Sequence, residues 1–251
     1  MPRPKTLCRP WIQLASAPQF NYIARVLLVY LRDVKPGLMR AANIKDRVMR
    51  WSRERKLSHF YSLRHAGESV LDVGIARNDW SDQVNVFLKR FCDSSALYTG
   101  LAVEDITEIA LQNPDKTFCR YDGSIFPFRD GAFDWVFSNA VIEHVGGRES
   151  QLLFLREMRR VARRVFFTTP NKYFPVESHT NVMFRHWSST GFYQWCRDNN
   201  PHWNEENLYL MSGSYLRQLL EEADVGPYAM SSNRILGWPM TYTVVLGQGR
   251  G

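Results

Sequence analysis

From Ser69 to the end of the chain, short apolar runs alternate with stretches that have helical spacing. This alternation is typical of an α/β domain, because a parallel strand is buried on both faces and needs a crossover helix to reach the next strand. Five runs have the character of such strands: 69–73, 96–103, 117–121, 133–139 and 165–169. Four stretches have helical spacing: 81–92, 106–112, 149–163 and 214–223.

Two further strands, 225–236 and 241–246, are predicted to form a hairpin around a turn at 237–239. The expected fold is therefore a Rossmann-like, doubly wound, mostly parallel seven-stranded sheet over residues 66–251, preceded by a helical N-terminal extension. Residues 184–210 are unusually aromatic, and we interpret them as an insertion over the sheet edge or the mouth of an active site. Such side chains suit stacking on sugars or covering an apolar acceptor, although an ordinary helical lid is equally compatible.

The basic charge of the chain is concentrated in residues 1–65. They contain 14 Lys and Arg against 3 Asp and Glu, a net charge of +11, whereas the rest of the chain carries −4. Helical spacing runs from 21 to 64 and is interrupted at Pro36-Gly37. This extension is either a basic arm that binds anionic lipid headgroups or a phosphorylated substrate, or a pair of helices that caps the main domain. Nucleic acid is disfavoured, since no base-reading motif accompanies the charge.

The remaining composition predicts a cytoplasmic protein, located peripherally at the inner membrane face if the arm binds lipid. The longest apolar run, 23–31, is interrupted by Arg25, and twelve helical residues would span about 18 Å against about 30 Å of bilayer core. No small-residue cleavage site follows that run. The four cysteines are far apart and form no CxxC pair, which predicts free thiols in a reducing compartment and argues against a structural zinc site.

Polar residues follow the predicted strands in a defined order. Asp72 and Gly74 close the first strand, Asp122-Gly123 follows the third, and Asn139 ends the fourth. In an open α/β sheet, a nucleotide-like ligand binds outside the carboxyl ends of the strands, and a glycine in the first turn allows close approach. The pattern therefore predicts a nucleotide-like ligand at this edge.

These motifs resemble those of the class I S-adenosylmethionine-dependent methyltransferases, type 11 subgroup. The matching segments are VLDVG at 70–74, YDGS and PF within 121–128, FDWVFSN at 133–139, IEHV at 142–145, REMRRV at 156–161 and TTPN at 168–171. The resemblance covers about 66–250 in the family's order. It implies a methyltransferase that uses S-adenosylmethionine without a metal.

The resemblance also implies roles for individual residues. Asp72 and Gly74 would line the methionine and ribose end of the cofactor. Asp122 would accept a hydrogen bond from the adenine amino group, and the backbone of Gly123 and Ser124 would meet the ring.

Two positions depart from the family pattern. The acid that accepts both ribose hydroxyls is expected where this chain has Ala102, and the nearest carboxylates are Glu104, slightly favoured, and Asp105. The glycine motif reads Gly74-Ile-Ala76-Arg-Asn78. Ala76 adds a methyl group within the cofactor loop, and Asn78 can still adopt a left-handed conformation.

Methyl transfer from a sulfonium requires alignment of the nucleophile, the methyl group and the sulfur, and a hydroxyl acceptor also requires a base. Asn139 is expected beside the transferring methyl group. His144 is the first candidate base, since it follows the fourth strand and histidine titrates near neutral pH. His179 is the second, with Glu177 as its orienting partner. Either histidine can equally be a local structural residue.

The expected function is methyl transfer to oxygen of a small-molecule, saccharide or lipid-linked acceptor. The Asp/Asn-Pro-Pro-aromatic motif of base methylation is absent from the sequence, so nucleic-acid bases are disfavoured as acceptors. The main alternative is a non-catalytic interaction or sensor protein that keeps the fold. A dinucleotide-dependent oxidoreductase is disfavoured, because the glycine fingerprint is absent. The sequence does not predict an oligomeric state.

Overall fold

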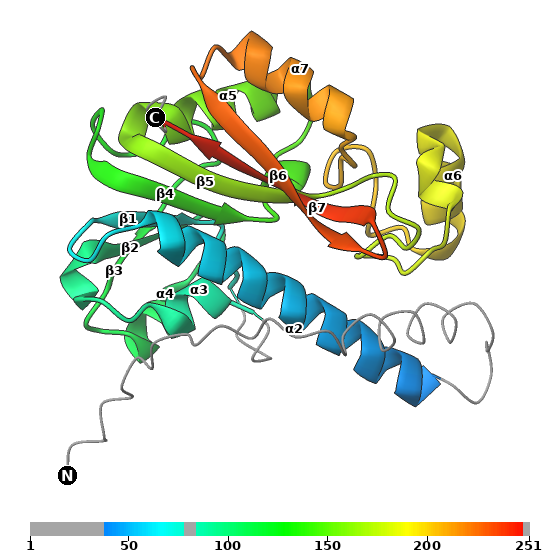
Figure 1. Cartoon of the computed structure of the whole chain (residues 1–251), viewed down its shortest axis with the longest axis horizontal. Coiled ribbons are helices and arrows are strands. Elements are labelled where there is room, and N and C mark those ends of the chain that lie inside the picture. Colours follow the sequence, from blue (N-terminus) through cyan, green and yellow to red (C-terminus); the bar gives the residue numbers. More distant parts are fainter. Residues whose placement is uncertain (1–37, 78–83, 248–251) are drawn as a thin grey trace. The chain divides into compact units, whose positions relative to one another are not determined.

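The computed structural model describes residues 38–77 and 84–247 (Figure 1). The chain divides into two compact units, Met1–Arg50 and Trp51–Gly251. The division falls within helix α2 (Leu38–Leu63), so the α/β unit begins at Trp51, before the boundary at residue 66 that the sequence suggests. Within the described residues, no helix combines the length and apolarity that a membrane span requires.

The second unit is built on the seven-stranded sheet that the sequence predicts. Its strands are β1 (Val70–Val73), β2 (Tyr98–Ala102), β3 (Thr117–Arg120), β4 (Phe133–Asn139), β5 (Ala162–Pro170), β6 (Tyr228–Ile235) and β7 (Trp238–Leu246). The order is β3-β2-β1-β4-β5-β7-β6, with β1 to β5 parallel and β7 antiparallel to both of its neighbours. The order reverses direction at β1 and β4, which is where open α/β sheets bind ligands.

Helices cover both faces of this sheet. They are α3 (Val86–Arg90), α4 (Thr107–Gln112), α5 (Arg148–Val161) and α7 (Gly213–Ala223), whereas α6 (Ser189–Asn199) lies apart from the sheet. The short 3-10 turns are η1 (Ser95–Leu97), η2 (Ile142–His144) and η3 (Arg185–Trp187). The two faces have separate cores, because alternate residues of each strand point to opposite sides. In β5, for example, Val165 and Phe167 join the core under α5 and α7, whereas Phe166 joins the core of α3, α4 and the end of α2.

The end of α2 belongs to the second core. Phe60 is fully buried, and its ring centroid lies 5.4 Å from Trp135, 5.1 Å from Phe137 and 5.5 Å from Phe166, all in edge-to-face geometry. Arg64 then pairs with Asp93 at 3.0 Å. These contacts explain why the compact unit starts inside the helix.

Two expectations about local structure are wrong. The helix expected over 81–92 is a single short helix, α3, because Asn85 adopts φ 49° immediately before it; residues 78–83 lie outside the described part. The hairpin turn lies at Leu236-Gly237, not at 237–239. Both turn residues have positive φ (50° and 82°), as a two-residue type I′ turn requires, and Pro239 belongs to β7.

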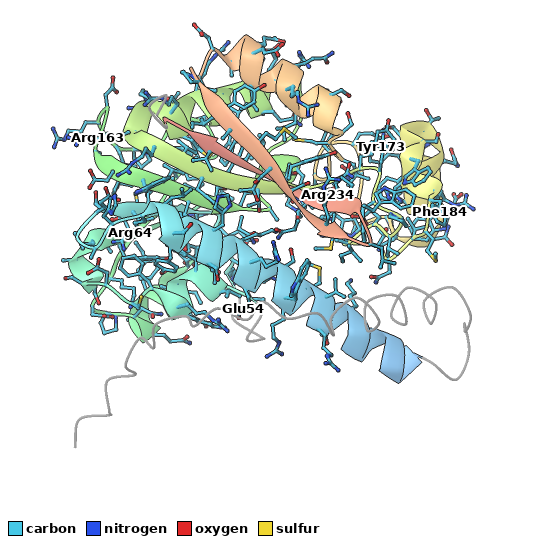
Figure 2. All side chains as sticks on the ribbon, in the orientation of Figure 1. Glu54, Arg64, Arg163, Tyr173, Phe184 and Arg234 are labelled. Atoms are coloured by element: carbon cyan, nitrogen blue, oxygen red, sulfur yellow. The ribbon has the colours of Figure 1, made fainter. Side chains whose placement is uncertain are left out.

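The aromatic segment forms a separate small core around α6. Its buried members are Phe192, Tyr193, Cys196, Leu208 and Leu210. Tyr173 and Phe184 lie at the same end of the second unit, beside α6 (Figure 2). This core gives the segment after β5 a fixed structure of its own.

Replacing Phe60 with alanine tests the contribution of α2 to the α/β core. We expect Phe60→Ala to lower the free energy of unfolding by about 3–5 kcal/mol, since it removes a fully buried ring and leaves a cavity. Urea denaturation followed by circular dichroism measures the change. Leu111→Ala, at a side chain that is 75% exposed, is the control and should change stability by less than about 0.5 kcal/mol. Equal stability of the two variants would contradict the assignment of α2 to this core.

Candidate active site

The loop after β1 is held against the segment that follows β4. Gly74 has φ 97°, and its N–H donates to the Leu101 carbonyl at 2.9 Å. A Cβ at this position would lie 2.3 Å from Cγ2 of Val141, so a side chain cannot fit without displacing Val141. Glycine is therefore required here both by its conformation and by this close approach.

An asparagine fixes the same loop one step further along. The Ala76 N–H donates to Oδ1 of Asn85 at 2.9 Å, and Asn85 Nδ2 donates to the Ala76 carbonyl at 3.0 Å. Both backbone groups of Ala76 are thus held by one side chain. The expectation for Asn78 lies outside the described residues. Asn85 carries no recognisable sequence signal, since its role depends on a contact nine residues away.

Asp72 lies in β1, and its side chain contacts a tyrosine of the neighbouring strand β2. Its side chain is buried, and the Tyr98 hydroxyl donates to Oδ2 at 2.6 Å. Burial raises the pKa of Asp72 to about 7, and the hydrogen bond from Tyr98 only partly offsets this effect. The carboxyl group therefore changes charge near neutral pH, which an ordinary aspartate does not do.

The two candidate acids after β2 have different surroundings. Glu104 is exposed, and its Oε2 accepts from the Arg77 N–H at 3.3 Å, which connects it to the loop after β1. Asp105 caps the turn before α4 by accepting from both the N–H and the hydroxyl of Thr107, and these bonds lower its pKa. Within the described residues, Glu104 is therefore the acid that accepts a hydrogen bond from the loop carrying Gly74 and Ala76.

Asp122, Gly123 and Ser124 form an exposed turn after β3. The Asp122 Oδ1 atom accepts from the Ser124 hydroxyl at 2.6 Å and from its N–H at 2.9 Å, and these bonds lower the pKa of Asp122. Gly123 has φ 91°, and a Cβ there would lie 3.6 Å from Val103. The ends of β2 and β3 therefore meet at this turn.

Two apolar side chains are exposed at these strand ends. Val103 is 49% and Ile125 is 55% exposed. Exposed carboxylates accept hydrogen bonds from amino and hydroxyl groups, and the apolar side chains offer surface to a planar ring. This combination fits an adenosine group. Val103 and Ile125 are not identified by the sequence motifs, because a single apolar residue beside a strand is common.

Asn139 lies at the end of β4 and is held from two sides. Its Oδ1 accepts from Lys56 Nζ at 3.1 Å and from the Thr168 hydroxyl at 2.9 Å. Lys56 comes from α2 and is buried, and burial lowers its pKa to about 8 against the opposing effect of nearby Glu143. Sequence reasoning missed Lys56, because nothing in the helical periodicity shows that α2 reaches the end of β4.

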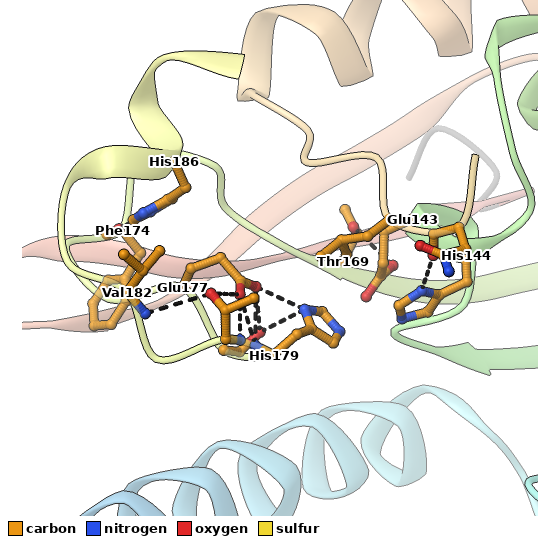
Figure 3. Close-up of polar contacts among 12 residues, drawn as sticks. Glu143, His144, Thr169, Phe174, Glu177, His179, Val182 and His186 are labelled. Carbon is orange, nitrogen blue, oxygen red and sulfur yellow. Dashed lines mark hydrogen bonds and ion pairs between the residues drawn. The ribbon is translucent and has the colours of Figure 1, made fainter. Parts of the chain in front are cut away.

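His144 and His179 lie together, 35 residues apart in the chain (Figure 3). Their ring centroids are 4.9 Å apart, and the Trp203 ring lies 5.7 Å from His144 and 5.1 Å from His179. The His144 Nδ1 lies 2.8 Å from the Asn207 carbonyl, so it carries the proton and donates it. The aromatic segment thus supplies two neighbours of this pair.

Glu177 orients His179, as the sequence suggests. Its Oε1 lies 2.7 Å from His179 Nδ1, and its Oε2 accepts from the Thr180 N–H and hydroxyl. Burial alone would raise the pKa of Glu177, but the hydrogen bonds and the charge of His179, together with those from Thr180, lower it to about 2. The carboxylate is therefore ionised and holds the imidazole in a fixed orientation.

Comparison with known proteins finds one matching domain family and many solved structures of similar fold. The family model of the methyltransferase domain, type 11, matches residues 87–165. A methyltransferase from Haloferax volcanii, solved with the methyltransferase activator Trm112, is 14% identical, with 82% of this chain and 94% of that chain covered and a TM-score of 0.53. An S-adenosylmethionine-dependent methyltransferase from Thermotoga maritima is 13% identical, with 90% of this chain and 94% of that chain covered and a TM-score of 0.51. A comparison with curated proteins finds no match.

The structural matches establish the fold, and the family model identifies the domain. Over residues 87–165 the chain matches the type 11 methyltransferase domain, which supports a class I S-adenosylmethionine-dependent methyltransferase. It is an enzyme, and its cofactor is S-adenosylmethionine.

The raised pKa of Asp72 predicts a pH-dependent stability. The folded chain holds a proton on Asp72 between the ordinary pKa of 3.8 and about 7, where the unfolded chain has released it, so this residue's contribution to stability falls as pH rises through that window. Asp72→Asn should remove the effect and be more stable than the wild type at pH 8 by about 1–4 kcal/mol. Urea denaturation at pH 5 and pH 8 measures the difference.

Asp93→Asn is a control of opposite sign. The N–H of Gly67 donates to Asp93 and lowers its pKa, so this substitution should destabilise the chain at pH 8 relative to the wild type. An Asp72→Asn variant that follows the wild-type pH dependence would show that Asp72 has an ordinary pKa.

Proposed function

We propose that this methyltransferase transfers the methyl group to an oxygen atom of a small-molecule, saccharide or lipid-linked acceptor. The observation that carries the proposal is the pairing of His144, which lies just after β4, with His179 from the segment after β5. A hydroxyl has to lose a proton as the new bond forms, and the unprotonated nitrogen of an imidazole can accept it.

The hydrogen bonds of the pair support this chemistry. Because Nδ1 of His144 donates to the Asn207 carbonyl, Nε2 is the basic nitrogen. The acceptor oxygen attacks the methyl carbon, the carbon–sulfur bond breaks, and the hydroxyl proton passes to Nε2. Alignment of the reactants supplies about 7–11 kcal/mol of barrier reduction in such reactions, and a general base adds about 10²–10⁴-fold.

We assign the cofactor contacts on the same basis. Asp122, with the backbone of Gly123 and Ser124, receives the adenine, and Val103 and Ile125 contact its faces. Glu104 receives the ribose hydroxyls, since it is hydrogen-bonded to the loop after β1. Asp72, Gly74 and Ala76 support the loop beside the methionine end, and Asn139 lies beside the methyl group.

Two substitutions separate cofactor binding from chemistry. His144→Asn keeps a donor for the Asn207 carbonyl but has no basic nitrogen, so we expect unchanged affinity for S-adenosylhomocysteine and a kcat about 10²–10⁴-fold lower. Asp122→Ala should instead weaken S-adenosylhomocysteine binding. Calorimetry gives the affinities, and release of S-adenosylhomocysteine in the presence of hydroxylated acceptors gives the rates. A His144→Asn variant with wild-type turnover would rule out His144 as the base.

We also propose that the enzyme docks on an anionic membrane surface, which would suit a lipid-linked acceptor. The support comes from an exposed surface, here called the aromatic patch, at the end of the second unit where Figure 2 labels Tyr173, Phe184 and Arg234. Its exposed members are Tyr173 (45%), Phe184 (44%) and Trp238 (43%), whose rings surround that of Trp187, and Leu236 (48%) in the turn before Trp238.

The charge around the aromatic patch is positive. Lys172, Arg185 and Arg234 flank it, and the segments 181–189 and 227–240 contain no Asp or Glu. Aromatic side chains with neighbouring cations are the usual composition of a surface that inserts among anionic headgroups. Residues 1–37 of the basic extension, where the sequence also suggests lipid binding, lie outside the described part.

Sedimentation with vesicles containing phosphatidylserine tests the aromatic patch. We expect Phe184→Ser combined with Trp238→Ser to reduce the bound fraction about tenfold, because each substitution removes apolar surface from the interface. Leu111→Ser, at an exposed residue of α4, is the matched control. Truncation of residues 1–60 is unsuitable, since it removes Leu57 and Phe60 from the core. Equal sedimentation of all three proteins would contradict docking through the patch.

A further inference from the structure

We propose that Glu143, His144 and His179 form a binding site for one divalent first-row transition-metal ion, contrary to the metal-free enzyme that the sequence suggests. One potential ligand atom from each of the three side chains lies within 4.8 Å of the others. Ligand atoms around a bound ion, each at about 2.1 Å from it, lie about 3–4 Å apart. Small side-chain rotations therefore bring the three atoms into coordination distance.

The hydrogen bonds around the two histidines are those of metal ligands. A histidine that binds a metal through one ring nitrogen usually donates from the other to a carboxylate or a backbone carbonyl. Here, His144 Nδ1 meets the Asn207 carbonyl at 2.8 Å, and His179 Nδ1 meets the Glu177 carboxylate at 2.7 Å (Figure 3). Both arrangements direct Nε2 to be the ligand atom.

The third residue gives an independent indication. Glu143 is 1% exposed, and its Oε2 accepts from the Thr169 hydroxyl at 3.0 Å. Its Oε1 is buried and has no hydrogen-bond partner within the described part of the chain. A buried carboxylate oxygen without a partner is unfavourable, and a cation is the partner that suits it. Nearby Lys56 uses its ammonium group to bind Asn139.

A general base alone does not account for all three residues. A His179–Glu177 pair would be sufficient to accept a proton, and it requires neither a second histidine nor a buried glutamate beside it. The three residues are brought together from two parts of the chain, η2 after β4 and the segment after β5, and both parts are fixed by hydrogen bonds. The Glu143 carbonyl, for instance, accepts from the Tyr209 N–H at 2.7 Å.

The ligand types define the class of ion. Two imidazoles and one carboxylate favour Mn²⁺, Fe²⁺, Co²⁺ or Zn²⁺ over Mg²⁺ and Ca²⁺, which prefer oxygen ligands alone. Three protein ligands leave coordination positions open. If the acceptor is an oxygen, as proposed above, a bound ion would lower the pKa of its hydroxyl. In that metal-bound enzyme His144 would hold the ion, and the hydroxyl proton would pass to solvent instead of to His144.

Titration with Co²⁺ tests the site directly, without cofactor or acceptor. The full-length chain is freed of metal by a chelator, and Co²⁺ is added while the visible d–d absorption is recorded. We expect saturation at one Co²⁺ per chain and displacement by Zn²⁺. Glu143→Gln and His179→Ala should each reduce the affinity for Co²⁺ at least about tenfold. Glu177→Gln alters only the orientation of His179, so it should reduce the affinity for Co²⁺ about 10–100-fold with the same stoichiometry.

His65→Ala is the matched control, because His65 is exposed and lies just beyond the C-terminal end of α2, outside the cluster. Circular dichroism establishes that each variant is folded. Absence of a saturable one-to-one spectrum in the wild-type chain would overturn the proposal, as would equal Co²⁺ affinity in Glu143→Gln, His179→Ala and His65→Ala. Methyl transfer is assayed separately with and without chelator, so failure of the metal site and failure of the proposed oxygen acceptor give different results.

Discussion

The parallel pairing of β1 with β2 on one side and with β4 on the other determines where the polar residues that follow these three strands lie. In register, Val73 is opposite Leu101 in β2 and opposite Ser138 in β4, so the three strands end at the same level. Gly74 then has to pass against Val141, which only a residue without a side chain can do. Because of this contact, the loop after β1 and the segment carrying Glu143 and His144 occupy one small region.

That region contains buried ionisable groups from three different elements. Burial raises the pKa of Asp72 and lowers that of Lys56, so both groups are shifted toward their neutral forms. Glu143, close to Lys56, is also buried. Next to them, Ala140 adopts φ 59°, a conformation that costs a non-glycine residue about 1–2 kcal/mol. Such unfavourable features persist where the surrounding sheet is stable enough to hold them, and they concentrate at functional sites.

The apolar runs are sufficient to predict the sheet, because strands buried on both faces have few alternatives, and the order of Asp72, Asp122 and Asn139 along the chain is sufficient to locate its ligand edge. Long-range contacts are what the sequence does not reveal. Lys56 binds Asn139, which lies 83 residues later in the chain. Asn85 binds the backbone of Ala76, nine residues earlier. The turn at Leu236-Gly237 was misplaced because leucine rarely adopts a positive φ, whereas the neighbouring proline resembles an ordinary turn residue.

In the proposed function, the cofactor and the acceptor are held by different parts of the structure. The residues assigned to the cofactor follow β1 to β4 and depend on the cores on the two faces of the sheet. The neighbours of His144 and His179 come instead from the segment after β5, in which Asn207 and Trp203 are positioned by the small core around α6. Since the small core around α6 shares no residues with the cores of the sheet, the proposed surroundings of the acceptor can change without disturbing the cofactor loop. Glu143 connects the parts, because its side chain bonds to Thr169 of β5 while its carbonyl holds Tyr209. A metal ion bound at Glu143, as proposed above, would therefore lie at the junction of these two parts of the structure.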